Sequence, residues 1–529
     1  MLADEILPLI KAYWPAIVVA VIAYKLLSNK YHNGLNKYPG HPLAGYTNWW
    51  RFFDVLGRHA EDTHIALHRK HGDIVRLGPN VLSIADPRAI KIIYGLNKGM
   101  TKSEFYPVQT AISKGRPIYS LFSTTDEDYH AKYRRCVNSA FAMSSLVGYE
   151  PLVDSTTDAF VEQTQKRYIA TGKPCNFSRW LQFFAFDVIG ELTWSKRLGF
   201  VELDEDVSGI VQFLSDFLGY AGPIGQQPLL DKLLQKNPVR LALERWGIRK
   251  HVFPVVKFAR EQSAARESQM KKVRETGEVT ASEKGVDLLT KFTQAQHDHP
   301  EFMTDDQVLS ACNSMVFAGS ETTAISLSRV FHNLVKHPEV YDKLMGELDE
   351  AACNGTIAER TNNKVGWAEA QKLPYLDAVI QESFRFQPAP GLIFERIVPP
   401  QGMDLLGDRI PGGTIVGCNP WVLHRRPEVF GKDVDTFRPE RWLEAEPAQL
   451  KEMKATMFQF GAGARTCIGK NVRYVHASYP HPFLDQPLTC HVVCSKFTSS
   501  CQPFCATSRS SSRSPTASWR LVMRGSCVH

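Results

Sequence analysis

The sequence predicts a mainly α-helical protein with a smaller β-rich region, an α+β fold, preceded by an N-terminal transmembrane helix. An apolar run near the N-terminus predicts the transmembrane helix, and helical periodicity dominates residues 126–350. Strand-like and loop-like sequence follows Pro388. The composition of the 529 residues, 43% hydrophobic and 22% charged, is typical of globular proteins and argues against disordered, collagen-like and coiled-coil classes.

The apolar run, residues 12–24, contains no charged side chain between Lys11 and Lys25. Extended to residues 6–27, it forms a helix of about 33 Å, which crosses one bilayer if Lys11 reaches back to the interface. A cleaved signal peptide is the alternative, but no basic segment precedes the run and no small-residue cleavage site follows it. We therefore predict a retained membrane anchor over residues 1–30.

The residues after the anchor predict its orientation. Lys25, Lys30 and Lys37 follow the apolar run, and basic residues collect on the cytosolic side of membranes. Pro39 and Pro42 stiffen the next segment. We expect a hinge over residues 31–45 and a cytosolic domain after it.

The body of the chain, residues 46–471, is predicted to be one domain. Early in it, two strand-like runs at residues 73–77 and 81–84 flank Gly-Pro-Asn at 78–80, a pattern typical of a β-hairpin.

One helix is predicted to cross the whole domain. Thr304 and Gln307 match a capping box, and no proline follows until Pro338, so the helix can run for about 33 residues. Its centre, residues 317–323, places a glycine beside two threonines, which is a weak sequence for a helix. This weakness indicates either a functional kink or a tolerated accident.

A second helix is predicted from Pro374 to just before Pro388. Glu382 and Arg385 lie three residues apart on it, so their side chains share one face. Taken alone, this spacing indicates a surface ion pair.

The loop at residues 460–469, Phe-Gly-Ala-Gly-Ala-Arg-Thr-Cys-Ile-Gly, is the most informative stretch. Its small residues allow backbone amides to approach a ligand, and a lone thiolate among amide donors is what a thiolate-ligated haem iron requires. A phosphate-binding loop and a dinucleotide fingerprint both fail on glycine spacing. A nucleophilic cysteine has no adjacent histidine to support it, and a plain buried cysteine leaves the glycines and Arg465 unexplained.

The pattern Phe-x-x-Gly-x-Arg-x-Cys-x-Gly in this loop resembles the haem-ligand signature of the cytochrome P-450 superfamily. Its members here are Phe460, Gly463, Arg465, Cys467 and Gly469.

Three further motifs resemble landmarks of the same family in the same order. Residues 318–323, Ala-Gly-x-Glu-Thr-Thr, resemble the oxygen-activation motif of the long central helix. Glu382 and Arg385 resemble the family's ion-pair motif, and Arg441 belongs to its partner motif at residues 439–442. The resemblance implies that Glu382, Arg385 and Arg441 form a buried structural triad, and this interpretation replaces that of a surface ion pair. The resemblance to the family covers roughly residues 1–471. Within the family, the sequence resembles fungal microsomal enzymes such as pisatin demethylase.

The resemblance also implies the roles of individual residues around haem b. Cys467 would be the axial thiolate ligand of the iron, and Glu321 and Thr322 would deliver protons during oxygen activation. Ala318 and Gly319 would leave room for dioxygen. The basic residues implied to hold the haem propionates are His130, Arg134, Arg396 and Arg465, and a tryptophan more common at the position of His130 is absent.

The implied activity is a monooxygenase that inserts one oxygen atom of O2 into a hydrophobic small molecule, in fungal secondary metabolism or detoxification. Electrons would come from NADPH through a membrane reductase. The implied location is the endoplasmic reticulum membrane, crossed once, with the catalytic domain in the cytosol. A dehydratase or isomerase of the same fold is less favoured because Glu321 and Thr322 are present.

Residues 472–529 depart from the family pattern. Pro480, Pro482 and Pro487 forbid a long helix, and 11 of the 58 residues are serine and five are cysteine. The gap between the two cysteine pairs is too short for an ordinary zinc module. We predict a disordered tail or one translated out of frame, and the alternative function is an inactive variant that does not retain haem.

The tail also accounts for the basic charge of the chain. It carries six basic residues and one acidic residue, a net charge of +5, so the total of +7 leaves +2 for residues 1–471. The nearly neutral body argues against a nucleic-acid partner.

Overall fold

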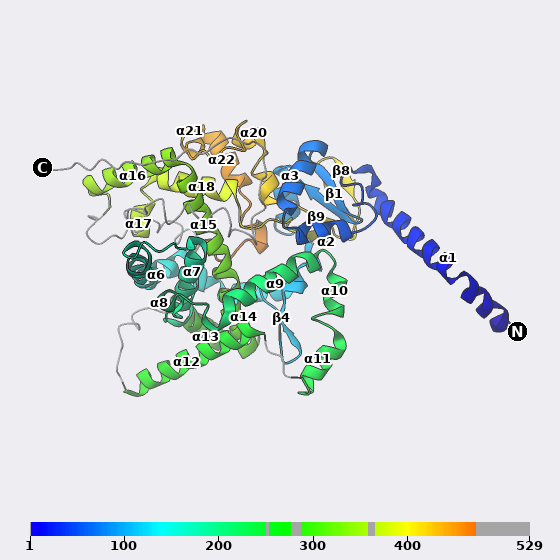
Figure 1. The fold of residues 1–529 in the computed structure, drawn as a ribbon, viewed down its shortest axis with the longest axis horizontal. Coiled ribbons are helices and arrows are strands. Elements are labelled where there is room, and N and C mark those ends of the chain that lie inside the picture. The colour runs from blue at the N-terminus through cyan, green and yellow to red at the C-terminus, as the bar shows by residue number, and fades with distance from the viewer. Residues whose placement is uncertain (1, 250–252, 277–286, 358–365, 472–529) are drawn as a thin grey trace.

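The structure is a computed structural model that describes residues 2–249, 253–276, 287–357 and 366–471. The predicted aberrant tail, residues 472–529, lies outside the described residues. The described chain is mostly helical with a small β region, as predicted (Figure 1).

The α-helices are α1 (Leu2–Lys30), α2 (Trp49–Leu56), α3 (Ala60–His71), α4 (Arg88–Tyr94), α5 (Glu127–Val137), α6 (Met143–Thr164), α7 (Phe177–Trp194), α8 (Phe200–Leu203), α9 (Ile210–Gly225), α10 (Pro228–Leu233), α11 (Pro238–Arg245), α12 (Pro254–Thr276), α13 (Leu288–Asp298), α14 (Asp305–Gly319), α15 (Glu321–Lys336), α16 (Pro338–Cys353), α17 (Trp367–Ala370), α18 (Pro374–Phe386), α19 (Pro420–Leu423), α20 (Pro427–Phe430), α21 (Arg441–Glu444) and α22 (Pro447–Thr456). Short 3-10 turns include η1 (His32–Lys37), η2 (Tyr106–Gln109) and η8 (Gly463–Arg465).

The strands are β1 (Ile74–Gly78), β2 (Val81–Ile84), β3 (Thr101–Lys102), β4 (Ala111–Ser113), β5 (Arg116–Ile118), β6 (Arg396–Ile397), β7 (Met403–Leu405), β8 (Asp408–Ile410) and β9 (Ile415–Gly417). Five of them form one sheet in the order β1-β2-β9-β6-β3, in which only β2 and β9 are parallel. The antiparallel pair β1 and β2 confirms the predicted hairpin. The pairs β4–β5 and β7–β8 form two separate hairpins.

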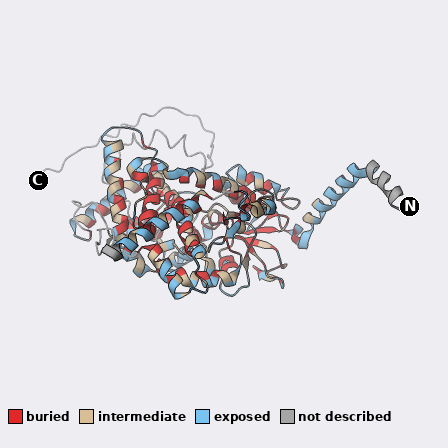
Figure 2. Ribbon diagram, turned by 90° about the horizontal axis from the view of Figure 1, so that it is seen from below, coloured by how far each residue is buried: buried red, intermediate tan, exposed pale blue. Residues whose placement is uncertain are grey.

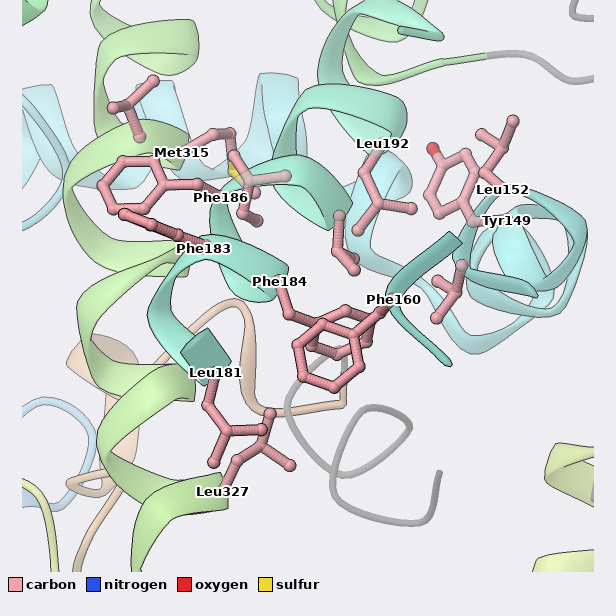
Figure 3. Packing of buried hydrophobic residues seen from close by; sticks show 14 of the residues in the cluster. Tyr149, Leu152, Phe160, Leu181, Phe183, Phe184, Phe186, Leu192, Met315 and Leu327 are labelled. Atoms are coloured by element: carbon pink, nitrogen blue, oxygen red, sulfur yellow. The ribbon is translucent and has the colours of Figure 1, made fainter. Parts of the chain in front are cut away.

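Helix α7 lies at the centre of the helical region. Fifteen of its 18 residues are buried, so it is covered on all sides by other helices. Phe160 of α6 contacts Phe184 of α7 (Figure 3). Phe160 also stacks on Trp180 with ring centroids 5.2 Å apart. This aromatic core packs α6 on α7, and α7 in turn packs against α14 and α15, so it supports the position of the long central helix.

The long central helix is two helices rather than one. The capping box of Thr304 and Gln307 is present as predicted, but α14 ends at Gly319 and α15 begins at Glu321. Ser320 lies between them with ψ near −65°, and its hydroxyl donates to the carbonyl of Val316. The run of about 33 residues is therefore interrupted inside the stretch whose weak sequence left a kink open, because serine and threonine hydroxyls that bond to carbonyls one turn back bend a helix.

Helix α18 begins with Pro374 and ends at Phe386, as the flanking prolines predict. Between α18 and the cysteine loop the chain forms β6 to β9 and four short helices, in agreement with the strand-like and loop-like sequence after Pro388.

Helix α1 extends away from the body as a single helix (Figures 1 and 2). Among the described residues, none of the helices combines the length and the apolar character that a membrane crossing requires. The predicted transmembrane character of residues 1–30 is therefore not confirmed.

The predicted hinge, residues 31–45, packs against the sheet. Leu35 and Tyr38 are buried, and the backbone N–H of Arg76 donates to the carbonyl of Pro39 at 2.7 Å. The guanidinium of Arg76 also donates to the carbonyls of Asn29 and Lys30, so it caps the C-terminal end of α1. This arginine joins α1, the hinge and β1.

Candidate functional site

The structure brings Glu382, Arg385 and Arg441 together in one buried network. Arg385 donates two hydrogen bonds to the Glu382 carboxylate, at 2.7 and 2.8 Å, and Arg441 donates a third at 3.0 Å. The side chains of Glu382 and Arg385 are completely buried, so the surface-pair interpretation is wrong. Burial alone would raise the pKa of Glu382, but its bonds to Arg385 and the charges of both arginines hold that pKa below its ordinary value.

The cysteine loop is held closed by its own backbone. The N–H of Cys467 donates to the carbonyl of Phe460 at 2.8 Å, and the N–H of Thr466 donates to that of Gly463 at 3.1 Å. Gly463 has a φ of +68°, and a Cβ there would overlap the carbonyl oxygen of Tyr94. Glycine is thus required at 463 by both backbone conformation and space, while the side chain of Cys467 is exposed.

Basic side chains gather beside this loop. Arg134 of α5 donates to the carbonyl of Thr466 at 2.7 Å, next to Cys467. His130, one turn earlier on α5, is buried, and burial followed by the charges of Arg465 and other basic residues lowers its pKa to about 3. Arg396 of β6 is also buried and contributes to that shift. The structure therefore brings together all four of the predicted propionate-binding residues.

Lys102 is a fifth basic residue of this group, which we call the basic cluster (Lys102, His130, Arg134, Arg396 and Arg465). It lies opposite Arg396 in the antiparallel pairing of β3 and β6, so the two side chains share a face of the sheet. Burial, and then the charges of Arg465 and Arg396, hold the pKa of Lys102 well below its ordinary value. The sequence pattern missed this residue, because only the pairing of strands far apart in sequence brings it to the site.

Arg465 has an acidic partner within the protein. Its guanidinium forms an ion pair with Glu127 at 2.8 Å and also donates to the carbonyl of Leu121. Glu127 is the first residue of α5 and is partly exposed, which leaves the buried part of the basic cluster with more cations than anions. A buried excess of positive charge favours an anionic ligand.

The centre of the long helix presents two different faces. Ala318 and Thr322 are exposed although about half of the residues of α14 and α15 are buried, and the Thr322 hydroxyl donates to the carbonyl of Ala318 at 2.7 Å. Gly319 instead faces α7, where an added Cβ would overlap the side chain of Ile189. The structure thus gives Gly319 a role in helix packing, and its predicted role beside dioxygen stays a prediction.

Glu321 is buried on the side of α7, and its carboxylate accepts a hydrogen bond from the side-chain amide of Gln182. Burial raises the pKa of Glu321 to about 7, and the Gln182 bond partly opposes this shift. Gln182 is a second residue that the sequence pattern missed.

These residues fit a haem group. Cys467 offers an exposed sulfur on a closed loop, the basic cluster offers donors for two propionates, and Ala318 and Thr322 offer an open helix face. The mainly helical fold and this combination define a haem-thiolate oxygenase as the class of protein.

The comparisons with known proteins agree with this class. A family model described as "Cytochrome P450" matches residues 38–478, and the chain belongs to this family, whose members bind haem iron through a cysteine. The match extends past the predicted boundary at Asn471. It supports the fold, the cofactor and an oxidoreductase that acts as a monooxygenase.

Several fungal proteins are similar over most of their length. A cytochrome P450 monooxygenase of Aspergillus terreus is 39% identical to this chain, and the matched region covers 87% of this chain and 92% of the relative's length. The cytochrome P450 monooxygenase cicH of Emericella nidulans is 36% identical, covering 88% and 89%. The cytochrome P450 monooxygenase asR2 of Sarocladium schorii is 35% identical, covering 82% and 83%.

Proposed function

We propose that this monooxygenase inserts one oxygen atom of O2 into a hydrophobic small molecule of fungal secondary metabolism or detoxification, with electrons from an NADPH-dependent membrane reductase. The observation that carries the proposal is the exposed Cys467 beside a buried basic cluster. In the reduced carbon monoxide difference spectrum, the wild-type protein gives the Soret shift of thiolate ligation and Cys467→His does not. A wild-type spectrum without that shift would overturn the proposal.

The residues of the chain have separate tasks in this function. Bound haem supplies the activation of dioxygen. Cys467 holds the iron, the basic cluster orients the propionates, and Phe460, Gly463 and Gly469 shape the loop around the thiolate. Glu321 and Thr322 deliver protons from solvent to the open face of the central helix.

A hydrophobic substrate is supported by the side chains near that face. Phe317 of α14 packs edge-on against Phe217 of α9 at 5.2 Å. Both belong to an apolar cluster that includes Val108 and Ile112 from the segment between β3 and β5. A substrate without charge fits such walls, since a buried charge there would find no partner among these side chains.

Membrane attachment through residues 1–30 is supported by exposed apolar side chains. Val19 and Tyr24 of α1 are 65% and 74% exposed. Exposed apolar residues continue on α10 and just after α11, where Leu229 is 70% and Trp246 is 73% exposed, on the side of the body from which α1 leaves (Figure 1). Apolar surface of this extent favours a lipid environment.

Fractionation of fungal cells tests the proposed location in the endoplasmic reticulum membrane. The full chain stays in microsomes after alkaline carbonate extraction, whereas a chain lacking residues 1–30 is released or held only weakly. Release of the full chain by carbonate would contradict the anchor.

The alternative of an inactive, haem-free variant receives no support from the comparisons. The tail on which it rests lies outside the described residues, and the same carbon monoxide spectrum decides it.

A further inference from the structure

Glu321 and Thr322 are neighbours in sequence, but their polar groups bind to different partners. Glu321 is 7% exposed, and its carboxylate accepts a hydrogen bond from Gln182 of α7. The Thr322 hydroxyl is exposed and donates to the carbonyl of Ala318. Successive residues of a helix point about 100° apart, so one side chain faces α7 while the other faces away from it.

Gln182 occupies a fixed place between the helices. Leu181 of α7 lies beside Leu327 of α15 (Figure 3), and the hydroxyls of Ser178 and Ser328 are 3.1 Å apart across the same pair of helices. Gln182 lies one turn after Ser178 and is itself half-buried. Helix packing therefore determines where its amide can reach.

The amide is the polar group that the structure places on this carboxylate. Burial and the Gln182 bond are the two causes that shift the pKa of Glu321. No charged side chain of the described residues contributes to this shift. None of the described residues forms an ion pair with Glu321 either. A buried carboxylate with one donor depends strongly on that donor for both its orientation and its charge.

We infer that Gln182 is a positioning residue that holds the Glu321 carboxylate against α7 and so controls proton delivery toward Thr322. The inference rests on the proposed role of Glu321 and Thr322. In this arrangement the carboxylate takes a proton from solvent, leaves the amide as the neutral acid, gives the proton up on the Thr322 side and returns as carboxylate to Gln182.

Gln182→Met in the full-length, haem-loaded protein tests the inference. Methionine keeps the length of the side chain but cannot donate, so the neutral acid is favoured and the titration midpoint of Glu321 rises by about one pH unit. The infrared carboxyl band that Glu321→Gln removes reports this midpoint. The matched control is Ser178→Ala, which removes a different polar contact between α7 and α15 and leaves the midpoint unchanged.

A second measurement reports proton delivery during turnover. In turnover with NADPH and the reductase but no added substrate, the fraction of electrons released as hydrogen peroxide is measured against pH. Its acid-side midpoint shifts upward in Gln182→Met together with the infrared midpoint, and Ser178→Ala follows the wild type. Gln182→Asn, whose shorter amide cannot reach, gives the same shift and replaces Gln182→Met if that variant fails to fold.

The possible outcomes distinguish a failure of the Gln182 inference from a failure of the proposed proton relay through Glu321 and Thr322. If Glu321→Gln leaves the peroxide fraction unchanged, the proton relay is wrong. If Glu321→Gln changes that fraction but the Gln182 variants titrate like Ser178→Ala, Gln182 does not position the carboxylate.

Discussion

The buried imidazole of His424 accepts a hydrogen bond from the backbone N–H of Phe458 at 2.8 Å through Nε2. Its Nδ1 lies 3.2 Å from the backbone carbonyl of Arg385. Because an N–H only donates, Nε2 carries no proton, and Nδ1 carries the proton that it donates to Arg385. His424 therefore joins the triad helix α18 to the segment that leads into the cysteine loop.

Acid is expected to destabilise the protein through His424. Burial, and then the charge of Arg385, lowers the pKa of His424 from an ordinary 6.5 to about 3. Burial likewise lowers the pKa of His64 to about 3. Between these values the unfolded chain binds protons that the folded chain does not, so stability is lost as pH falls from about 6.5 toward 3. At pH 5 the loss is about 2 kcal/mol for each such histidine. Urea unfolding at pH 7 and pH 5 measures it.

His424→Gln provides the control for this acid effect. Glutamine keeps an acceptor and a donor but does not titrate, so its unfolding free energy falls less between pH 7 and pH 5 than that of the wild type. Equal losses in the two proteins would show that His424 does not contribute.

Loss of the Glu382 carboxylate charge is expected to be costly. In Glu382→Gln, Arg385 remains buried without its counter-charge while Arg441 keeps only Asp433, and the free energy of unfolding falls by about 3–5 kcal/mol. The control is Arg69→Gln, which breaks an exposed ion pair with Asp435 and costs less than about 1 kcal/mol. Equal costs for both variants in urea unfolding would refute a structural role of the triad.

The local parts of this structure are predictable from the sequence because short segments decide them. The capping box at Thr304, the proline start of α18 and the β1–β2 hairpin each depend on a few adjacent residues, and the structure has all three. The cysteine motif is equally local, so Cys467 and its glycines are found at once.

Contacts between distant segments escaped prediction. Lys102 reaches the basic cluster only because β3 pairs with β6, and Gln182 meets Glu321 only because α7 packs along α15. A single sequence records residue types but not which helix faces which, and the energy of burying α7 decides that.

Gly463→Ala is expected to lose haem. The φ of +68° costs a non-glycine residue about 1–3 kcal/mol before the overlap with the Tyr94 carbonyl is counted. Since 1.4 kcal/mol is a factor of ten, haem content falls about tenfold. Gly346→Ala in α16 is the matched control, because nothing lies within 4 Å of its new Cβ. Haem per polypeptide, measured after purification, checks both, and full haem content in Gly463→Ala would contradict the required glycine.

Lys102→Met is expected to have opposite effects on the haem-free and haem-loaded chains. Without an anionic ligand, removing a buried cation opposite Arg396 relieves repulsion and raises the thermal midpoint. With haem bound, one propionate partner is missing, and haem leaves about fivefold to tenfold faster. The rate of haem transfer to excess apomyoglobin measures the second effect. The control, Lys98→Met, makes the same change of charge at an exposed position nearby. If the two variants release haem at the same rate, Lys102 does not belong to the haem site.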